Sequence, residues 1–311
     1  MAARTLSLTP PRRRLAADSR LALLLRSPVA LLSALVLIFL LLVAIIGAPL
    51  LQDLANTQNL RLRFFRPFSL ERGWAYVLGA DALGRPMLAQ LIVGARTSFL
   101  VAGATVALAA TIGTTLGMVS GYIGGVVDAA LMRISDIIVT VPSLLLALSV
   151  LFVLEPSILN LILVLAVARL PIYLRVSRAQ TLEIRERVFV EASRALGKGT
   201  SSILWRDIRP LVVPTVMTVA MLEIASVMLA AAGLSFLGVG LQRPDVDWGT
   251  IVSEGREYLT RAWWATVFPG LAILVTALAA NLLSNWMRAS GDPLQAAAMG
   301  VTASREEAAR P

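Results

Sequence analysis

The sequence contains no cysteine and no histidine, and Lys198 is its single lysine. Without cysteine the chain can form no disulfide and has no thiol nucleophile. Without histidine it lacks the commonest zinc and haem ligand and the commonest acid–base catalyst. These absences argue against a metal-dependent enzyme and against a hydrolase built on a catalytic triad.

Charge is also scarce, because only 15% of the residues are charged while 57% are hydrophobic. With a mean hydropathy of +0.78, the composition is typical of a polytopic membrane protein. Lipid offers no partners to backbone groups, so the spanning segments must be helices or a closed barrel. The apolar runs are too long for barrel strands, and we therefore predict an all-α membrane protein.

Six segments are apolar enough to span a bilayer, which takes about 20 residues each. They cover residues 28–50, 97–120, 131–154, 157–177, 211–239 and 265–287. The first follows an Arg-rich segment, 1–27, but is too long for a signal peptide, so we read it as an uncleaved anchor. The remaining organisation that we expect is an extracytoplasmic segment 51–96, a core transmembrane domain 97–287 and a tail 288–311.

The distribution of positive charge predicts the orientation of these spans. Segments 1–27, 121–133, 175–210 and 288–311 hold 18 of the 28 basic residues, whereas 51–96 and 240–264 hold 9. Basic residues concentrate in cytoplasmic loops. We therefore expect both termini and the 175–210 loop to be cytoplasmic.

Glycine recurs every four residues at Gly113, Gly117 and Gly121. Small residues at this spacing let two membrane helices approach closely. The stripe fits a gate or a seam between subunits, but ordinary packing within the chain explains it more simply.

The loop 175–210 is hydrophilic and reads as a helical hairpin. Charged helix-like sequence runs to residue 196, Gly197 can end it with a left-handed backbone, and a second short helix follows. Pro210 should interrupt that helix where the next span begins. The loop's net charge of +4 is too small to indicate nucleic-acid binding. The residues alone leave a solvated connector and a docking socket equally open.

Several motifs carry a family resemblance. "EASRALG" (191–197) followed by "DIRP" (207–210) resembles the EAA motif of binding-protein-dependent ABC importer permeases. The chain is similar in particular to the dipeptide/oligopeptide/nickel branch. Further stretches that agree in order are "LGADALGRPML" (78–88), "GARTSFLVAG" (94–103), "GYIGGVVD" (121–128), "LMRISDIIVTVPSLLLAL" (131–148), "AGLSFLGVGLQRPDVDWG" (232–249) and "SEGREYLTRAWWATVFPGLAI" (253–273). The similarity covers about residues 78–293.

The resemblance implies a permease subunit of an ATP-driven importer in the bacterial inner membrane, for di- or oligopeptides. It also implies four kinds of partner: a second homologous permease, two ATPase subunits, an extracytoplasmic solute-binding protein and the lipid bilayer, with no nucleic acid. The hairpin would be a coupling helix that seats on the ATPase. The implied docking residues are Val190, Glu191, Ala192, Ser193, Arg194, Ala195, Leu196 and Gly197.

The chain shows no ATP site of its own. "GKGT" (197–200) has glycine after the lysine where a phosphate-binding loop needs serine or threonine. We therefore expect no enzymatic activity and no cofactor in this chain, with ATP and Mg²⁺ bound by the partner subunits.

Arg169 and Glu223 are the clearest charges inside predicted spans. Charges there are costly, so they are functional candidates. Counting 1.5 Å per residue from the cytoplasmic ends gives depths of roughly 13 and 18 Å, close enough for the side chains to meet. A polar lining of the translocation path and a structural ion pair are both consistent with this placement.

The chain departs from the family pattern at four positions. Ser193 stands where the EAA motif usually has alanine, and Arg209 stands where leucine usually precedes the proline. Pro86 follows Arg85 where the family usually has aspartate, and Ala231 stands where an acidic residue is common, with Glu223 two turns earlier.

Two other functions compete with the permease reading. A secondary transporter or channel would work without ATPases and leaves the hairpin unexplained. An intramembrane enzyme would need a nucleophile–base pair, and Lys198 lies in the predicted cytoplasmic loop.

Overall fold

Helices account for the regular structure of the chain, as the composition predicts. A computed structural model describes residues 23–25, 27–69 and 71–291. The α-helices are α2 (Pro28–Leu42), α3 (Ala48–Asn56), α4 (Met87–Ile123), α5 (Gly125–Thr140), α6 (Ser143–Val153), α7 (Ile158–Arg185), α8 (Val188–Ala195), α9 (Thr200–Ser202), α10 (Arg209–Phe236), α11 (Trp248–Gly255) and α12 (Trp264–Gly291). Two π-helical stretches, η1 (Val43–Gly47) and η4 (Ile203–Ile208), join α2 to α3 and α9 to α10. The all-α prediction is confirmed for the described residues, which contain no strand.

Five continuous helices within the described ranges are long and apolar enough to cross a membrane, and a sixth span requires α5 and α6 together. These two helices meet at an angle of 83°. The predicted span 131–154 is therefore a bent pair and not one straight helix. The cause is Pro142, which disfavours helical geometry at the residue before it, and Val141 is indeed extended, with φ −90° and ψ 127°.

The helices run beyond the predicted spans. The first continues through η1 to Asn56 instead of ending at residue 50, and α4 begins at Met87, ten residues before the predicted start. The 37 residues of α4 measure about 56 Å, whereas a bilayer core is about 30 Å thick. The expected boundaries at 50/51 and 96/97 thus fall inside helices. The predicted terminal segments 1–27 and 288–311 lie almost wholly outside the described residues.

Pro210 does not interrupt the second helix of the hairpin. Residues Thr200–Phe236 form one continuous helical run in which α9 and η4 lead into α10. The π-helical turn has already shifted the hydrogen-bond pattern when the chain reaches Pro210 at the start of α10. The proline, which has no N–H to donate, therefore stands where the regular α-helical hydrogen bonds are already interrupted, and the helix can continue past it.

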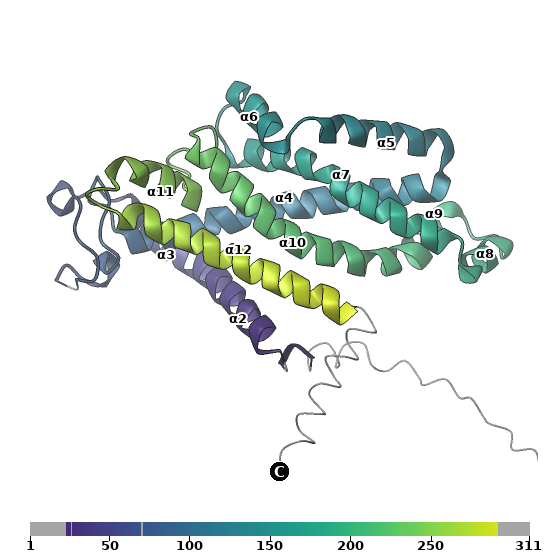
Figure 1. Cartoon of the computed structure of the whole chain (residues 1–311), viewed down its shortest axis with the longest axis horizontal. Coiled ribbons are helices and arrows are strands. Elements are labelled where there is room, and N and C mark those ends of the chain that lie inside the picture. Colours follow the sequence, from purple (N-terminus) through teal and green to yellow (C-terminus); the bar gives the residue numbers. More distant parts are fainter. Residues whose placement is uncertain (1–22, 26, 70, 292–311) are drawn as a thin grey trace, which may run out of the picture.

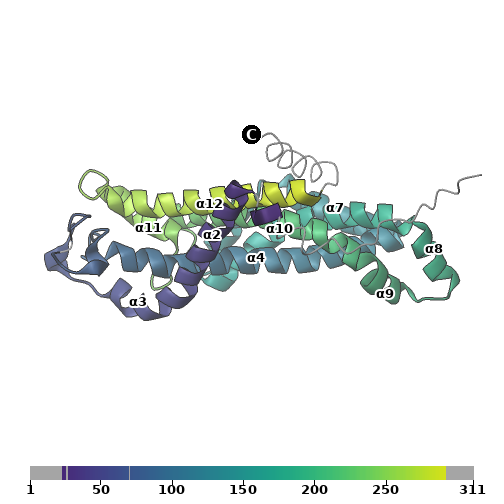
Figure 2. The ribbon, with the colours of Figure 1, turned by 90° about the horizontal axis from the view of Figure 1, so that it is seen from below.

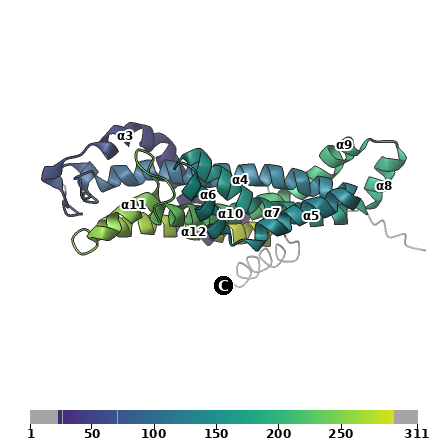
Figure 3. The same ribbon diagram turned by 90° about the horizontal axis from the view of Figure 1, so that it is seen from above.

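The long helices lie along one axis of the molecule, and short helices and loops form its two ends (Figure 1). Helices α4, α7, α10 and α12 run along the long axis, and α2 crosses α12 obliquely (Figure 2). Figure 3 shows α5 lying along α7, with α6 turned away after the bend. We call the end with α8 and α9 the hairpin end, and the opposite end, formed by residues 57–86 and 237–263, the cap end.

The glycine stripe of α4 packs against α7 within the same chain. A Cβ on Gly113 would lie 2.7 Å from the Cβ of Tyr173 and 2.9 Å from the carbonyl oxygen of Leu170. A Cβ on Gly121 would lie 2.8 Å from the carbonyl oxygen of Arg178. Real Cβ atoms do not approach so closely, so the two backbones touch because these residues are glycine. Intrachain packing is therefore the role of the stripe.

We predict that Gly117→Ala destabilises the fold, because its Cβ would collide with the carbonyl oxygen of Leu174 and with Ser177. Overpacking of this kind typically lowers the free energy of unfolding by about 1–3 kcal/mol. The matched control is Gly103→Ala on the same helix, where nothing lies within 4 Å of the added Cβ. Thermal unfolding in detergent should show a loss for Gly117→Ala alone, and equal behaviour of the two variants would contradict the seam.

Candidate functional site

The hairpin presents a short helix, α8, whose end is fixed by glycine. Gly197 has a φ of +75°, as predicted. The N–H of Lys198 donates to the carbonyl oxygen of Ser193 at 3.1 Å, and the N–H of Gly197 donates to that of Arg194 at 2.9 Å. This pair of hydrogen bonds is the Schellman motif, which satisfies the last carbonyl groups of a helix.

One face of α8 packs on the protein, and the other is exposed in the part of the chain that the structure describes. Val190 and Ser193 are buried, and Val190 belongs to the same hydrophobic core as Ile184 and Ile203. On the free side Val188 is 80% exposed and Leu196 81% exposed. The remaining predicted docking residues, Glu191, Ala192, Arg194, Ala195 and Gly197, are also exposed. The structure therefore divides the predicted docking residues into two that support the helix and six that a partner could reach.

Polar contacts hold the hairpin against the rest of the chain. Lys198 Nζ lies 3.1 Å from Asp207 Oδ2, which closes the loop between α8 and η4. Arg194 Nε donates to Tyr122 Oη at 3.2 Å. The second contact ties the hairpin to the end of α4, and the sequence alone gave no indication of it.

Arg169 of α7 and Glu223 of α10 come together, with Nη1 and Oε2 3.4 Å apart. The arginine side chain is 20% exposed and the glutamate side chain 7%. Arg169 Nε and Glu223 Oε2 make no hydrogen bond, and neither does the buried hydroxyl of Tyr173. The contact confirms the expectation that the two side chains are close enough to meet, and it places the pair inside the subunit between two helices.

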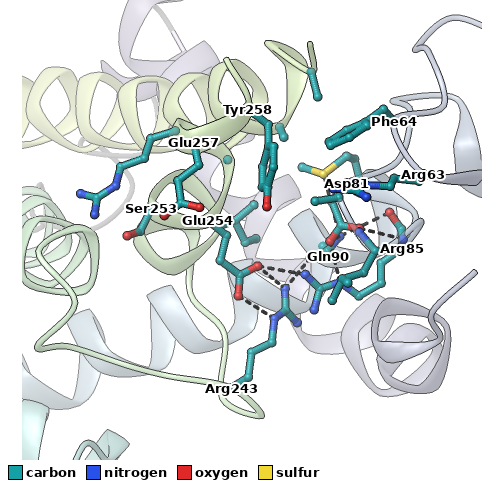
Figure 4. Close-up of a pocket in the computed structure, with 18 of the residues that line it drawn as sticks. Arg63, Phe64, Asp81, Arg85, Gln90, Arg243, Ser253, Glu254, Glu257 and Tyr258 are labelled. Carbon is teal, nitrogen blue, oxygen red and sulfur yellow. Dashed lines mark hydrogen bonds and ion pairs between the residues drawn. The ribbon is translucent and has the colours of Figure 1, made fainter. Parts of the chain in front are cut away.

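A network of ion pairs lies at the cap end (Figure 4). Arg85 donates from Nε to Asp81 Oδ2 at 2.5 Å and from Nη2 to Glu254 Oε2 at 3.0 Å. Arg243 donates from Nε to Glu254 Oε1 at 2.7 Å and from Nη2 to Gln90 Oε1 at 2.7 Å. Two arginines and two carboxylates thus balance in charge. They join the segment before α4 to α11 and to the segment that precedes α11.

These side chains line a pocket of about 510 Å³, together with Phe64 and Tyr258, whose ring centroids are 5.2 Å apart. Figure 4 shows Tyr258 and Phe64 in the upper part of the view and Arg85 and Arg243 below them. In the sequence Arg85 stands out only as the neighbour of an unusual proline. Its partner Glu254 is 169 residues away in the chain, which is why the pairing could not be foreseen.

Helix α11 is anchored at its first turn. Asp247 Oδ1 accepts from the N–H of Thr250 at 2.7 Å, and Ser235 Oγ donates to Asp247 Oδ2 at 3.0 Å. Burial raises the pKa of the Asp247 carboxyl, and the hydrogen bonds from Thr250 and Ser235 act against that rise. Trp248 Nε1 donates to the carbonyl oxygen of Leu91 at 2.9 Å. The cap end is therefore a preorganised surface fixed to α4 and α10.

We predict strong coupling between Arg169 and Glu223 in stability. Removing one member of a buried pair typically costs about 3–5 kcal/mol, because the other charge is left without a partner, while removing both costs less. Arg169→Leu and Glu223→Leu should each lower the thermal stability of the purified chain, and the double variant should recover part of the loss.

An ion pair on the surface provides the control for this double-mutant comparison. Arg187 Nη2 lies 2.7 Å from Glu183 Oε1 with both side chains at least half exposed, so Arg187→Leu should cost less than about 1 kcal/mol. Strictly additive losses at Arg169 and Glu223 would show that the two charges act independently.

Comparisons with known proteins agree with this architecture. The family model of binding-protein-dependent transport system inner membrane components matches residues 113–294. The chain is 36% identical over 268 residues to the "probable D,D-dipeptide transport system permease protein DdpC" of Escherichia coli, which covers 86% of this chain and 88% of that protein. It is 38% identical over 228 residues to the di/tripeptide permease protein DppC of Pseudomonas aeruginosa, covering 73% of this chain and 75% of that one.

A third relative is the glutathione transport system permease protein GsiD of Pectobacterium atrosepticum, 35% identical over 219 residues, which are 70% of this chain and 73% of that one. Among solved structures, an inward-facing MetNI methionine ABC transporter chain aligns with a TM-score of 0.50 at 18% identity, over 65% of this chain and 98% of that chain. The structural likeness shows the shared fold. The family match and these relatives together identify the chain: it belongs to the binding-protein-dependent transport system inner membrane components, the permease subunits of ABC importers.

Proposed function

We propose that the chain forms the translocation path of a peptide importer together with a second, homologous permease subunit. The peptide substrate is supported by the relatives, whose names specify D,D-dipeptides, di- and tripeptides, and glutathione. The importer would alternate between inward-open and outward-open states, whose populations its partners shift. Partners would act on the chain at two places, the hairpin end and the cap end.

The observation that carries the proposal is the exposed face of α8. Val188 and Leu196 are large apolar side chains, 80% and 81% exposed, at the two ends of a helix that lies beyond the apolar spans. Gly197 and buried Val190 hold this helix in one orientation. A rigid, partly apolar knob suits docking into a partner. The partner that fits the family is an ABC ATPase, two copies of which would bind and hydrolyse ATP with Mg²⁺.

The orientation belongs to the same proposal. The hairpin end and both termini face the cytoplasm, as the excess of basic residues indicates. The cap end then faces the solute-binding protein, with the pocket around Arg85 and Glu254 at that surface. In this proposal ATP and Mg²⁺ bind to the ATPase subunits and not to this chain, and the hairpin loop, with a net charge of only +4, binds no nucleic acid.

We predict that Gly197→Val and Glu191→Arg uncouple ATP hydrolysis from transport while the chain remains inserted. A side chain at a φ of +75° strains the backbone by about 1 kcal/mol or more, although nothing lies within 4 Å of the added Cβ. Glu191→Arg reverses a charge on the exposed face of α8. Transport and binding-protein-stimulated ATPase activity of the whole complex measure the effect, alongside its subunit composition.

The matched control lies two residues away in the same loop. Gly199 has a φ of −68°, which any residue adopts, and nothing lies within 4 Å of an added Cβ. Gly199→Val should therefore transport normally. Coupled transport at the wild-type level in both Gly197→Val and Glu191→Arg would mean that the hairpin is only a connector.

A further inference from the structure

Three arginines of the hairpin end converge on the turn between α4 and α5. Arg185, the last residue of α7, donates from Nη1 to the carbonyl oxygen of Gly121 at 2.9 Å. Arg194 of α8 donates to the hydroxyl of Tyr122, and its guanidinium carbon lies 5.0 Å from the centre of that ring. The third, Arg178, lies two turns before the end of α7. All three reach residues 120–128, which we call the α4–α5 turn.

Arg178 holds the far side of this turn in a bidentate clamp. Its Nε donates to Asp128 Oδ1 at 2.5 Å and its Nη2 donates to Asp128 Oδ2 at 2.6 Å. Ser120 Oγ donates to the same Oδ1 at 2.5 Å, so Asp128 is bound from both α7 and α4. Bidentate, charge-assisted contacts fix geometry as well as adding energy.

The backbone of the turn leaves it little freedom to slide along α7. Gly124 and Gly125 have φ values of +71° and +58°, which reverse the chain direction between the two helices. Gly121 brings the end of α4 against the carbonyl oxygen of Arg178, with no side chain between them. The ends of α4, α5 and α7 are therefore in direct contact, and Arg194 adds α8 to this group.

The other arm of the hairpin has a different attachment. Beyond Gly197, α9 and η4 continue directly into α10, and the Lys198–Asp207 pair links η4 to the loop that follows α8. The chain itself joins α8 to both flanking spans, to α7 through residues 186–187 and to α10 through α9 and η4. A displacement of α8 that reaches α7 can pass through the clamp into α5, which ends at the 83° bend before α6.

We propose that the α4–α5 turn is a positioning element of the coupling loop. The Asp128–Arg178 clamp makes α4, α5, α7 and α8 move as one body, so that the displacement of α8 by the ATPase reaches the bend between α5 and α6. The proposal rests on the proposed function of α8 as the ATPase contact. Asp128 and Arg178 act through the position of α8 and need no contact with the ATPase or with the peptide.

The test uses the full complex with both permeases, the ATPases and the binding protein, reconstituted in liposomes. Uptake of peptides from a tryptic digest of casein is quantified by mass spectrometry and divided by the ATP hydrolysed. Asp128→Asn should lower this ratio at least about fivefold, the lower end of ordinary coupling between sites. Arg178→Lys is the milder variant, since it keeps the charge but loses the bidentate contact, and it should lower the ratio in the same direction.

The exchange of charges, Asp128→Arg with Arg178→Asp, should restore part of the ratio. The matched control is Asp136→Asn, because Asp136 also pairs α5 with α7, through Arg175 at 2.9 Å, but in an exposed contact away from the turn. That variant should keep the wild-type ratio. A purely structural role would lower the amount of assembled complex and leave uptake per ATP unchanged.

The outcomes separate this proposal from the one it rests on. A wild-type complex whose uptake does not depend on the binding protein and ATP would contradict the proposed function, and the clamp with it. Coupled uptake in the wild type together with unchanged ratios in Asp128→Asn and Arg178→Lys would contradict the clamp alone.

Discussion

The backbones of α4 and α7 touch along successive turns, because glycine at three positions of α4 places no side chain between them. In lipid the hydrophobic effect gives helices little reason to associate, so close packing of this kind supplies much of the attraction. The contact between α4 and α7 also positions the functional side chains of α7. Arg169 meets Glu223 of α10 on one side, and Arg178 and Arg185 meet the α4–α5 turn at the hairpin end.

The same seam connects the two ends of the molecule through α4. At its first turns Gln90 enters the ion network of the cap end, and at its last residues Tyr122 receives Arg194 from α8. The two ends differ in what they leave open. The cap-end network balances its charges internally around a pocket, whereas the hairpin end leaves Val188 and Leu196 exposed. Exposed apolar surface is more typical of a contact with another protein than a charge-balanced surface is.

The sequence was informative where a local rule governs the structure. Apolar runs located the spans, and Gly197 marked the end of α8 because a left-handed backbone favours glycine. The contact between Arg169 and Glu223 could be anticipated because charges inside apolar spans are few and depth follows from helical rise. The role of that pair in the translocation path and the role of the exposed α8 residues in ATPase docking stay predictions.

The sequence did not predict those features of the structure that depend on tertiary contacts. The apolar run 131–154 concealed the bend at Pro142, although the proline itself was the signal. Asp128 and Arg178 are separated by 50 residues, and each resembles an ordinary charge near a membrane surface. Likewise, α4 begins ten residues before the predicted span because its first turns pack against α3, where Ala89 and Val93 join one apolar cluster with Ala48 and Ala55, and this contact cannot be read from the sequence.

The central claim is that α8 is a cytoplasmic surface which the ATPase covers, and labelling of a single cysteine tests it most directly in this cysteine-free chain. With Leu196→Cys, a membrane-impermeant maleimide should react in inside-out vesicles stripped of ATPase subunits, and should react little when those subunits are restored. Leu259→Cys, exposed at the cap end, should react only in right-side-out vesicles. Labelling of Leu196→Cys from outside, or at an unchanged rate with the ATPase present, would contradict the account.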